Sequence, residues 1–84
     1  MYYVYLIKSI NKNWQYVGYS TDLKKRLKTH QKGLSSATKP YRPFNLIFYE
    51  AYKSRVDAKR REKYFKTNQG RRALKLLVTD SLKN

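Results

Sequence analysis

The sequence contains no cysteine, and only 5 of its 84 residues are acidic. The absence of cysteine excludes disulfide bonds, zinc sites built on thiolates and catalysis by a thiol nucleophile. The apolar run at the N-terminus, Met1 to Lys8, is too short for a signal peptide or a membrane span. No internal repeat, low-complexity stretch or linker divides the chain, so we expect one soluble, cytoplasmic domain over residues 1–84.

Positive charge is abundant: 20 Lys and Arg residues give a net charge of +15. Such an excess repels itself, which indicates a polyanionic partner. Nucleic acid is the common one, because basic side chains neutralise phosphates and release counterions. A membrane surface is a weaker alternative, since the basic residues are not confined to one face of an amphipathic helix. A soluble protein that is merely basic is the third reading.

The first half of the chain shows two strand patterns followed by a helix pattern. Residues 2–8 and 14–19 are rich in aromatic and β-branched types, and the turn residues between them predict an antiparallel hairpin. Residues 20–22 offer an N-cap. A helix should follow to about Lys32, where Gly33 provides a left-handed terminator.

The second half begins with residues 34–45, which contain both prolines and predict an exposed basic loop. Residues 46–52 predict a third strand. Ser54 and Asp57 have the spacing of a capping box, which starts a helix running to about Thr67.

Asn68, Gln69 and Gly70 are expected to break the chain before a last helix over residues 73–82. The apolar stripe of that helix is Ala73, Leu74, Leu77 and Val78. The resulting order, ββαβαα, predicts an α+β fold in which helices flank a three-stranded antiparallel sheet.

Glu62 is the carboxylate with no ordinary explanation. Two of the other four lie at helix starts, one ends a strand and one lies in the polar tail. Glu62 shares a helix face with Ala58 and Phe65, which look inward. A carboxylate there is costly unless it is paired or bound to a metal. The sequence therefore leaves two readings, a metal ligand or a salt-bridge partner of a nearby Arg or Lys.

Arg26 and His30 form a second unusual pair in the first helix. They lie four residues apart, at the edge of the face that carries Leu23 and Leu27. The planar fork of Arg26 suits phosphate oxygens, and His30, the only histidine, could relay a proton or orient a phosphate. The alternative is that both lie on a solvated basic face.

Tyr5 and Tyr16 are expected on the same side of the hairpin, because an even-length loop aligns their faces. Two phenols near a metal-bound water could position or deprotonate it. A phenol titrates near about 10, so a role as base requires a neighbouring cation or metal. Gly18 allows a backbone or substrate to approach closely.

The ordered set of motifs resembles the GIY-YIG nuclease family over nearly the whole chain. Tyr3-Val4-Tyr5 resembles the first family triplet, with Tyr for Gly and Val for Ile, and Tyr16-Val17-Gly18 resembles the second. Residues 19–30 then lead through Arg26 to His30, and residues 58–66 place Glu62 at the acidic position. The loop and strand over residues 38–50 are similar to those of small stand-alone bacterial members.

The resemblance implies a metal-dependent endonuclease that hydrolyses phosphodiester bonds with Mg²⁺ or Mn²⁺ held by Glu62. By the same resemblance Tyr5 would position or deprotonate the attacking water, and Tyr16 would lie against the scissile phosphate. Arg26 would stabilise the transition-state charge, and His30 would assist Tyr5 or contact phosphate. The residues expected to contact nucleic acid are Lys24, Lys39, Arg42, Lys66 and Asn68.

Two functions from different classes follow from these observations. The first is an active nuclease, directed by structure or damage, that acts on DNA in preference to RNA, in repair or recombination. The second is a nucleic-acid-binding module that keeps the fold without turnover, and a scaffold docked on an RNA–protein particle is a weaker third. Targeting would come from the basic surface itself or from a protein partner, because phosphate contacts alone carry no sequence information.

Overall fold

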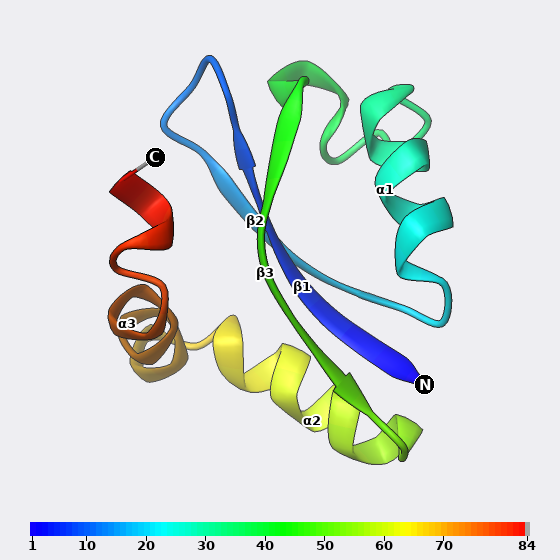
Figure 1. The fold of residues 1–84 in the computed structure, drawn as a ribbon, viewed down its shortest axis with the longest axis vertical. Coiled ribbons are helices and arrows are strands. Elements are labelled where there is room, and N and C mark those ends of the chain that lie inside the picture. Colours follow the sequence, from blue (N-terminus) through cyan, green and yellow to red (C-terminus); the bar gives the residue numbers. More distant parts are fainter. Residues whose placement is uncertain (84) are drawn as a thin grey trace.

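The computed structural model describes residues 1–83. Its order is β1 (Tyr2–Ser9), β2 (Gln15–Ser20), α1 (Leu23–Gln31), β3 (Phe44–Tyr52), α2 (Arg55–Phe65) and α3 (Asn68–Leu77). Short 3₁₀ turns at Lys39–Tyr41 and Ser81–Lys83 precede β3 and follow α3. Helix α1 covers one face of the sheet, and α2 and α3 cover the other (Figure 1). The predicted α+β architecture and the order ββαβαα are confirmed.

The sheet has the strand order β2-β1-β3, and both pairings are antiparallel. The central strand β1 is buried on both faces, and residues 4–7 are at most 1% exposed. Strand β2 pairs with β1 alone among the described strands, so its outer edge carries backbone groups that no other strand of residues 1–83 uses.

Alternation along β1 divides the core into two layers. Val4 and Leu6 pack with Ala58 and Phe65 of α2 and with residues of α3. Tyr5 and Ile7 point to the opposite face, where Leu23 and Leu27 of α1 cover them. The predicted common side for Tyr5 and Tyr16 is confirmed, because both belong to this second layer.

The predicted signals at the helix ends are confirmed for α1 and α2. The Asp22 carboxylate accepts a hydrogen bond from the Lys25 N–H at 3.1 Å, and the Ser54 hydroxyl accepts one from the Asp57 N–H at 3.3 Å. Gly33 follows α1 with φ of +73°, a left-handed conformation that favours glycine.

The expected chain break at Asn68, Gln69 and Gly70 is wrong, because these residues form the first turn of α3. The Thr67 hydroxyl caps that helix by accepting a hydrogen bond from the Gly70 N–H at 3.0 Å. Gly70 is buried, and a Cβ there would overlap the carbonyl of Tyr64. The glycine is therefore needed for α2 and α3 to pack closely.

The last helix also ends earlier than predicted, at Leu77 instead of Leu82. Leu77 is 57% exposed, so it does not belong to the apolar stripe, whereas Leu74 and Val78 are buried. Leu82 still packs against the core from the 3₁₀ turn that follows.

The segment over residues 34–45 is not the fully exposed loop that its prolines predict. Thr38 is completely buried, and Phe44 is 4% exposed and begins β3 two residues earlier than expected. Both face the layer under α1, which draws the segment onto the protein. Among residues 1–83, no helix combines the length and apolar character needed to cross a bilayer.

Candidate active site

Tyr5 enters the site from the centre of the sheet, and its ring lies directly over Gly18 of β2. The two residues are cross-strand partners in the antiparallel pair. A Cβ at position 18 would overlap Cζ and the hydroxyl oxygen of Tyr5. The glycine therefore leaves the space that the phenol occupies.

A buried chain of hydrogen bonds links Tyr5 to α1 and to the segment that follows it. The Tyr5 hydroxyl oxygen lies 2.6 Å from Nε2 of His30, and Nδ1 of His30 lies 2.8 Å from Oγ1 of Thr38. Tyr5 and His30 are each 1% exposed and Thr38 is 0% exposed. Three elements distant in sequence thus meet through buried polar side chains.

The tautomer of His30 with its hydrogen on Nδ1 is compatible with both contacts of the ring. In that tautomer Nδ1–H donates to the Thr38 hydroxyl oxygen, which lies 3.4 Å from the carbonyl oxygen of Ser35. Nε2 of the neutral imidazole is then an acceptor, and it takes the hydrogen of the Tyr5 hydroxyl. His30 is therefore positioned as a base toward Tyr5.

Burial and neighbouring charge shift both groups toward their neutral forms. Burial raises the pKa of Tyr5 to about 12; the nearby Arg26 opposes this rise, and Tyr16 and Glu62 add smaller upward contributions. Burial also lowers the pKa of His30 from its ordinary value, and the positive charge of Arg26 lowers it further. Near neutral pH the pair is thus a phenol and a neutral imidazole.

Arg26 lies on α1 beside these two groups, where its side chain interacts with the Tyr5 hydroxyl and lowers the pKa of Tyr5. Its Nε is buried and has no hydrogen-bond partner among residues 1–83. A buried donor without an acceptor is costly, and native structures keep few of them. A phosphate oxygen is the acceptor that a guanidinium fork fits best. The solvated basic face considered for Arg26 and His30 is wrong for His30, which is buried.

Tyr16 lies on β2 and connects this cluster to α2. Its ring centroid is 5.6 Å from that of His30, and its ring stacks on Trp14 at 6.0 Å. From the α2 side, Nζ of Lys66 lies 5.5 Å from the centroid of the Tyr16 ring. Tyr16 therefore stands between the catalytic candidates of α1 and the basic C-terminal end of α2.

Glu62 faces lysines and not the core. Its Oε1 lies 3.6 Å from Nζ of Lys59, and its Oε2 lies 3.2 Å from Nζ of Lys66. The side chain is 17% exposed, while Ala58 and Phe65 are buried. The inward position predicted for Glu62 is thus right only in part, because the carboxylate reaches the rim of the site where solvent and ligands can meet it.

The donor type of Glu62 fits a hard divalent cation. Mg²⁺ binds through one or two carboxylates and completes its shell with waters and substrate phosphates. Among residues 1–83, no three His, Asp or Glu side chains gather as a multidentate site would require. A metal would therefore rest on this one carboxylate and would compete there with Lys59 and Lys66.

The basic and polar residues predicted to contact nucleic acid lie on three parts of the surface. Lys24 lies in the first turn of α1, next to a hollow lined by Tyr3 and Tyr49. Lys39 and Arg42 lie together before β3, where Arg42 Nε donates to the Lys39 carbonyl at 3.2 Å. Lys66 and exposed Asn68 lie at the junction of α2 and α3. Only Lys66 contacts the Tyr16 and Glu62 side chains directly.

Comparisons with known proteins identify the family to which the chain belongs. A family model for the GIY-YIG catalytic domain matches residues 1–75. The chain belongs to the GIY-YIG nuclease family. The matched range includes every site residue described above.

Relatives of the GIY-YIG chain are small bacterial proteins. The UPF0213 protein YazA of Bacillus subtilis is 41% identical over 66 residues, which are 77% of this chain and 66% of that protein. A UPF0213 protein of Streptococcus pyogenes is 40% identical over 70 residues, covering 82% and 75% of the two chains. The solution structure of a UPF0213 protein from Bacillus halodurans aligns with a TM-score of 0.57 at 30% identity, covering 90% of this chain and 83% of that one.

Some residues of the candidate site carry a signal in the sequence, and one does not. Tyr5, Tyr16 and Gly18 stand in the two triplets, and the structure brings all three together. Thr38 was missed, because a threonine in a basic, proline-containing segment has no sequence signal for burial. Only the packing of that segment on α1 reveals its hydrogen bond to His30.

Proposed function

We propose that this protein is a metal-dependent endonuclease that hydrolyses phosphodiester bonds in DNA, with a role in repair or recombination. The observation that carries the proposal is the buried contact of the Tyr5 hydroxyl with a neutral His30, beside an Arg26 donor that has no partner within residues 1–83. A fold that needed only stability would gain by replacing these polar groups with apolar ones.

In this proposal Tyr5 receives the proton of the attacking water while it passes its own proton to His30. With a pKa of about 12, the phenolate form of Tyr5 is less abundant than the phenol near pH 7 by roughly five powers of ten. Transfer to Nε2 of His30 at 2.6 Å avoids that intermediate, because the proton already points at its acceptor. In this proposal the contact with Thr38 keeps His30 in the tautomer that can accept the proton.

Arg26 would meet the non-bridging phosphate oxygens, where negative charge grows in the transition state. Tyr16, exposed in part and next to Lys66, would lie against the scissile phosphate and orient it. Glu62 would hold Mg²⁺ or Mn²⁺, which supplies charge stabilisation at the phosphate and the leaving oxygen when it is bound. The net charge of +15 would bring the polyanionic substrate to this face.

A nucleic-acid-binding module without turnover is the second candidate function, and one observation favours it. Both oxygens of Glu62 are already within ion-pair distance of a lysine ammonium, as expected for a structural carboxylate. Binding alone, however, would give no use to the buried contact between Tyr5 and His30. The two candidates therefore differ in whether the protein turns over its substrate.

The deciding experiment is a cleavage assay on branched, nicked, single-stranded and duplex DNA, with matched RNA substrates. Each substrate is incubated with Mg²⁺, with Mn²⁺ and with a chelator. We expect cleavage of DNA that requires metal and stops in the chelator. Salt-sensitive binding without any product under all metal conditions would support the binding module and contradict the nuclease.

A further inference from the structure

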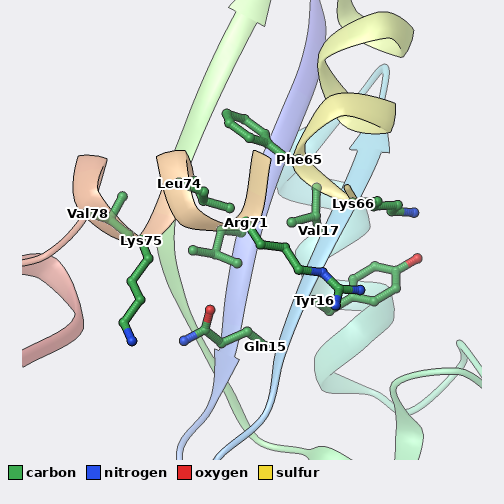
Figure 2. Close-up of a pocket in the computed structure, with 10 residues that line it drawn as sticks. Gln15, Tyr16, Val17, Phe65, Lys66, Arg71, Leu74, Lys75 and Val78 are labelled. Carbon is green, nitrogen blue, oxygen red and sulfur yellow. The ribbon is translucent and has the colours of Figure 1, made fainter. Parts of the chain in front are cut away.

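A groove of about 510 Å³ lies between the open edge of β2 and α3, next to the candidate active site. Figure 2 shows it with Gln15, Tyr16 and Val17 of β2 on one side and α3 on the other. Tyr16 belongs both to this groove and to the cluster around His30. The groove lies on the face of the sheet that α2 and α3 cover, and it meets the place proposed for the scissile phosphate at Tyr16 on the edge strand.

The floor and the rim of the groove differ in character. The floor is apolar: Val17 is partly exposed there, and the buried core side chains Leu6, Phe65, Leu74 and Val78 lie beneath it. The rim carries three cations, Lys66, Arg71 and Lys75, and none of the described residues that line the groove is acidic. The Arg71 side chain extends from α3 toward the Tyr16 ring (Figure 2).

The rim cations have little compensation from the protein itself. Lys66 pairs with Glu62, whereas neither Arg71 nor Lys75 forms a side-chain ion pair or hydrogen bond within residues 1–83. Three like charges around one groove repel one another, and a polyanion would relieve that repulsion. An apolar floor beneath cations also matches the two parts of a nucleotide, a flat base and a charged phosphate.

We propose that this groove binds one unpaired nucleotide adjacent to the scissile phosphate, with its base on the apolar floor and its phosphate at Arg71. Lys75 and Lys66 lie on either side of that phosphate path. A base paired inside a duplex cannot reach such a floor, because its faces are stacked and its edge is hydrogen-bonded. The groove thus selects substrates with a displaced or single-stranded nucleotide next to the cut. This inference rests on the proposed nuclease function for the position of the scissile phosphate.

The test measures binding in the presence of a chelator, so that no cleavage is needed. Labelled single-stranded DNA, the same strand with an abasic position, and the matched duplex are titrated with wild type, Arg71→Ala and Arg72→Ala. Arg72 is the matched control, because it also lies on α3 but lines a different hollow with Leu76 and Leu82. Both arginines are exposed, so both variants should fold, which circular dichroism verifies.

We expect Arg71→Ala to weaken single-strand binding on the order of tenfold, and Arg72→Ala to weaken it far less. The slope of log affinity against log salt should fall by about 0.7 in Arg71→Ala, the value for one phosphate contact on a single strand. Wild type should bind the abasic strand less tightly than the complete strand, and the duplex should be insensitive to Arg71→Ala.

Equal losses in Arg71→Ala and Arg72→Ala would overturn the proposal, because the groove would then be part of a general basic surface. Equal affinity of wild type for the abasic and complete strands would also overturn it. These results are independent of turnover. If the protein cuts DNA but Arg71→Ala leaves the KM and kcat for single strands unchanged, the groove assignment fails and the nuclease stands.

Discussion

The hydroxyl oxygen of Tyr5 lies 2.6 Å from Nε2 of His30, and each side chain is 1% exposed. The contact joins the central strand of the sheet to the last turn of α1. The phenol donates in the tautomer in which Nδ1–H donates to Thr38. In the proposed mechanism, proton transfer from Tyr5 therefore depends on which nitrogen of His30 carries the hydrogen.

Thr38→Val should disturb that assignment while keeping the shape of the side chain. The change leaves Nδ1–H without an acceptor in a buried place, at a cost of about 1–3 kcal/mol of stability. Nitrogen NMR of the single histidine should show the Nδ1–H tautomer in wild type and a mixture in Thr38→Val. Thr38→Ser retains the hydroxyl and is the control. It should show the wild-type tautomer and the wild-type cleavage.

Arg26→Lys should reduce turnover far more than binding. Lysine keeps the charge but lacks the planar fork whose Nε is buried without a partner in residues 1–83. Loss of one preorganised donor typically costs on the order of 100-fold in rate. The measurement is single-turnover cleavage together with affinity in a chelator. Cleavage at the wild-type rate would place Arg26 among the general basic residues.

Gly18→Ala tests the close approach of Tyr5 to β2. The added methyl group would overlap the Tyr5 phenol, which must then move away from its position against His30. Overpacking of this kind costs about 1–3 kcal/mol. We expect a lower melting temperature and a large loss of cleavage. A variant that melts and cuts like wild type would show that the phenol tolerates displacement.

The stability of the fold should decrease as the pH falls below about 6.5, because of His30. Burial lowers the pKa of His30 in the folded state, and Arg26 lowers it further, so the unfolded chain binds a proton at a higher pH than the folded protein does. The loss continues until the pH passes the folded pKa and then levels off. His30→Gln lacks this titration. The difference in free energy of unfolding between wild type and His30→Gln, measured with denaturant, should therefore become smaller as the pH falls from about 8 to about 5. A constant difference would contradict a lowered pKa.

Glu62→Gln separates the metal ligand from the salt-bridge partner. Lys59 and Lys66 are each 48% exposed, and partly exposed pairs of this type contribute only about 0.3–0.5 kcal/mol each. A metal ligand should therefore lose Mg²⁺-dependent cleavage with little change in melting temperature, and DNA binding should persist. If Glu62→Gln still cuts with Mg²⁺, the metal assignment is wrong.

Glu50→Gln is the matched control for that experiment. The Glu50 carboxylate accepts hydrogen bonds from Arg61 and from the Tyr52 hydroxyl. Burial acts to raise the pKa of Glu50, but these hydrogen bonds outweigh it and hold the pKa below its ordinary value. Glu50→Gln should lower the melting temperature near neutral pH and spare cleavage, the reverse of the pattern expected for Glu62→Gln.

The sequence predicted the elements whose signals are local. Alternation placed Tyr5 and Tyr16 on one face, and Asp22, Gly33 and Ser54 marked helix ends that the structure confirms. Local signals fail at Gly70, which together with Asn68 and Gln69 predicts a break in the chain before the last helix. There the close packing on the Tyr64 carbonyl decides, and it leaves room for hydrogen alone.

Burial of polar groups was the part of the site that sequence could not supply. The sequence allows two interpretations of His30, because a histidine four residues after an arginine can lie on a solvent-exposed surface or in the core. Thr38 gave no signal at all. Both became interpretable only when the segment before β3 was seen packed against α1.

The open edge of β2 has a consequence for the protein at high concentration. An edge strand with free backbone groups is a template on which a second copy can extend the sheet. Lys66, Arg71 and Lys75 surround this edge, so two copies that approach through it must bring their cations together. This positive charge would therefore oppose the association of two molecules through β2. That protection weakens as added salt screens the repulsion.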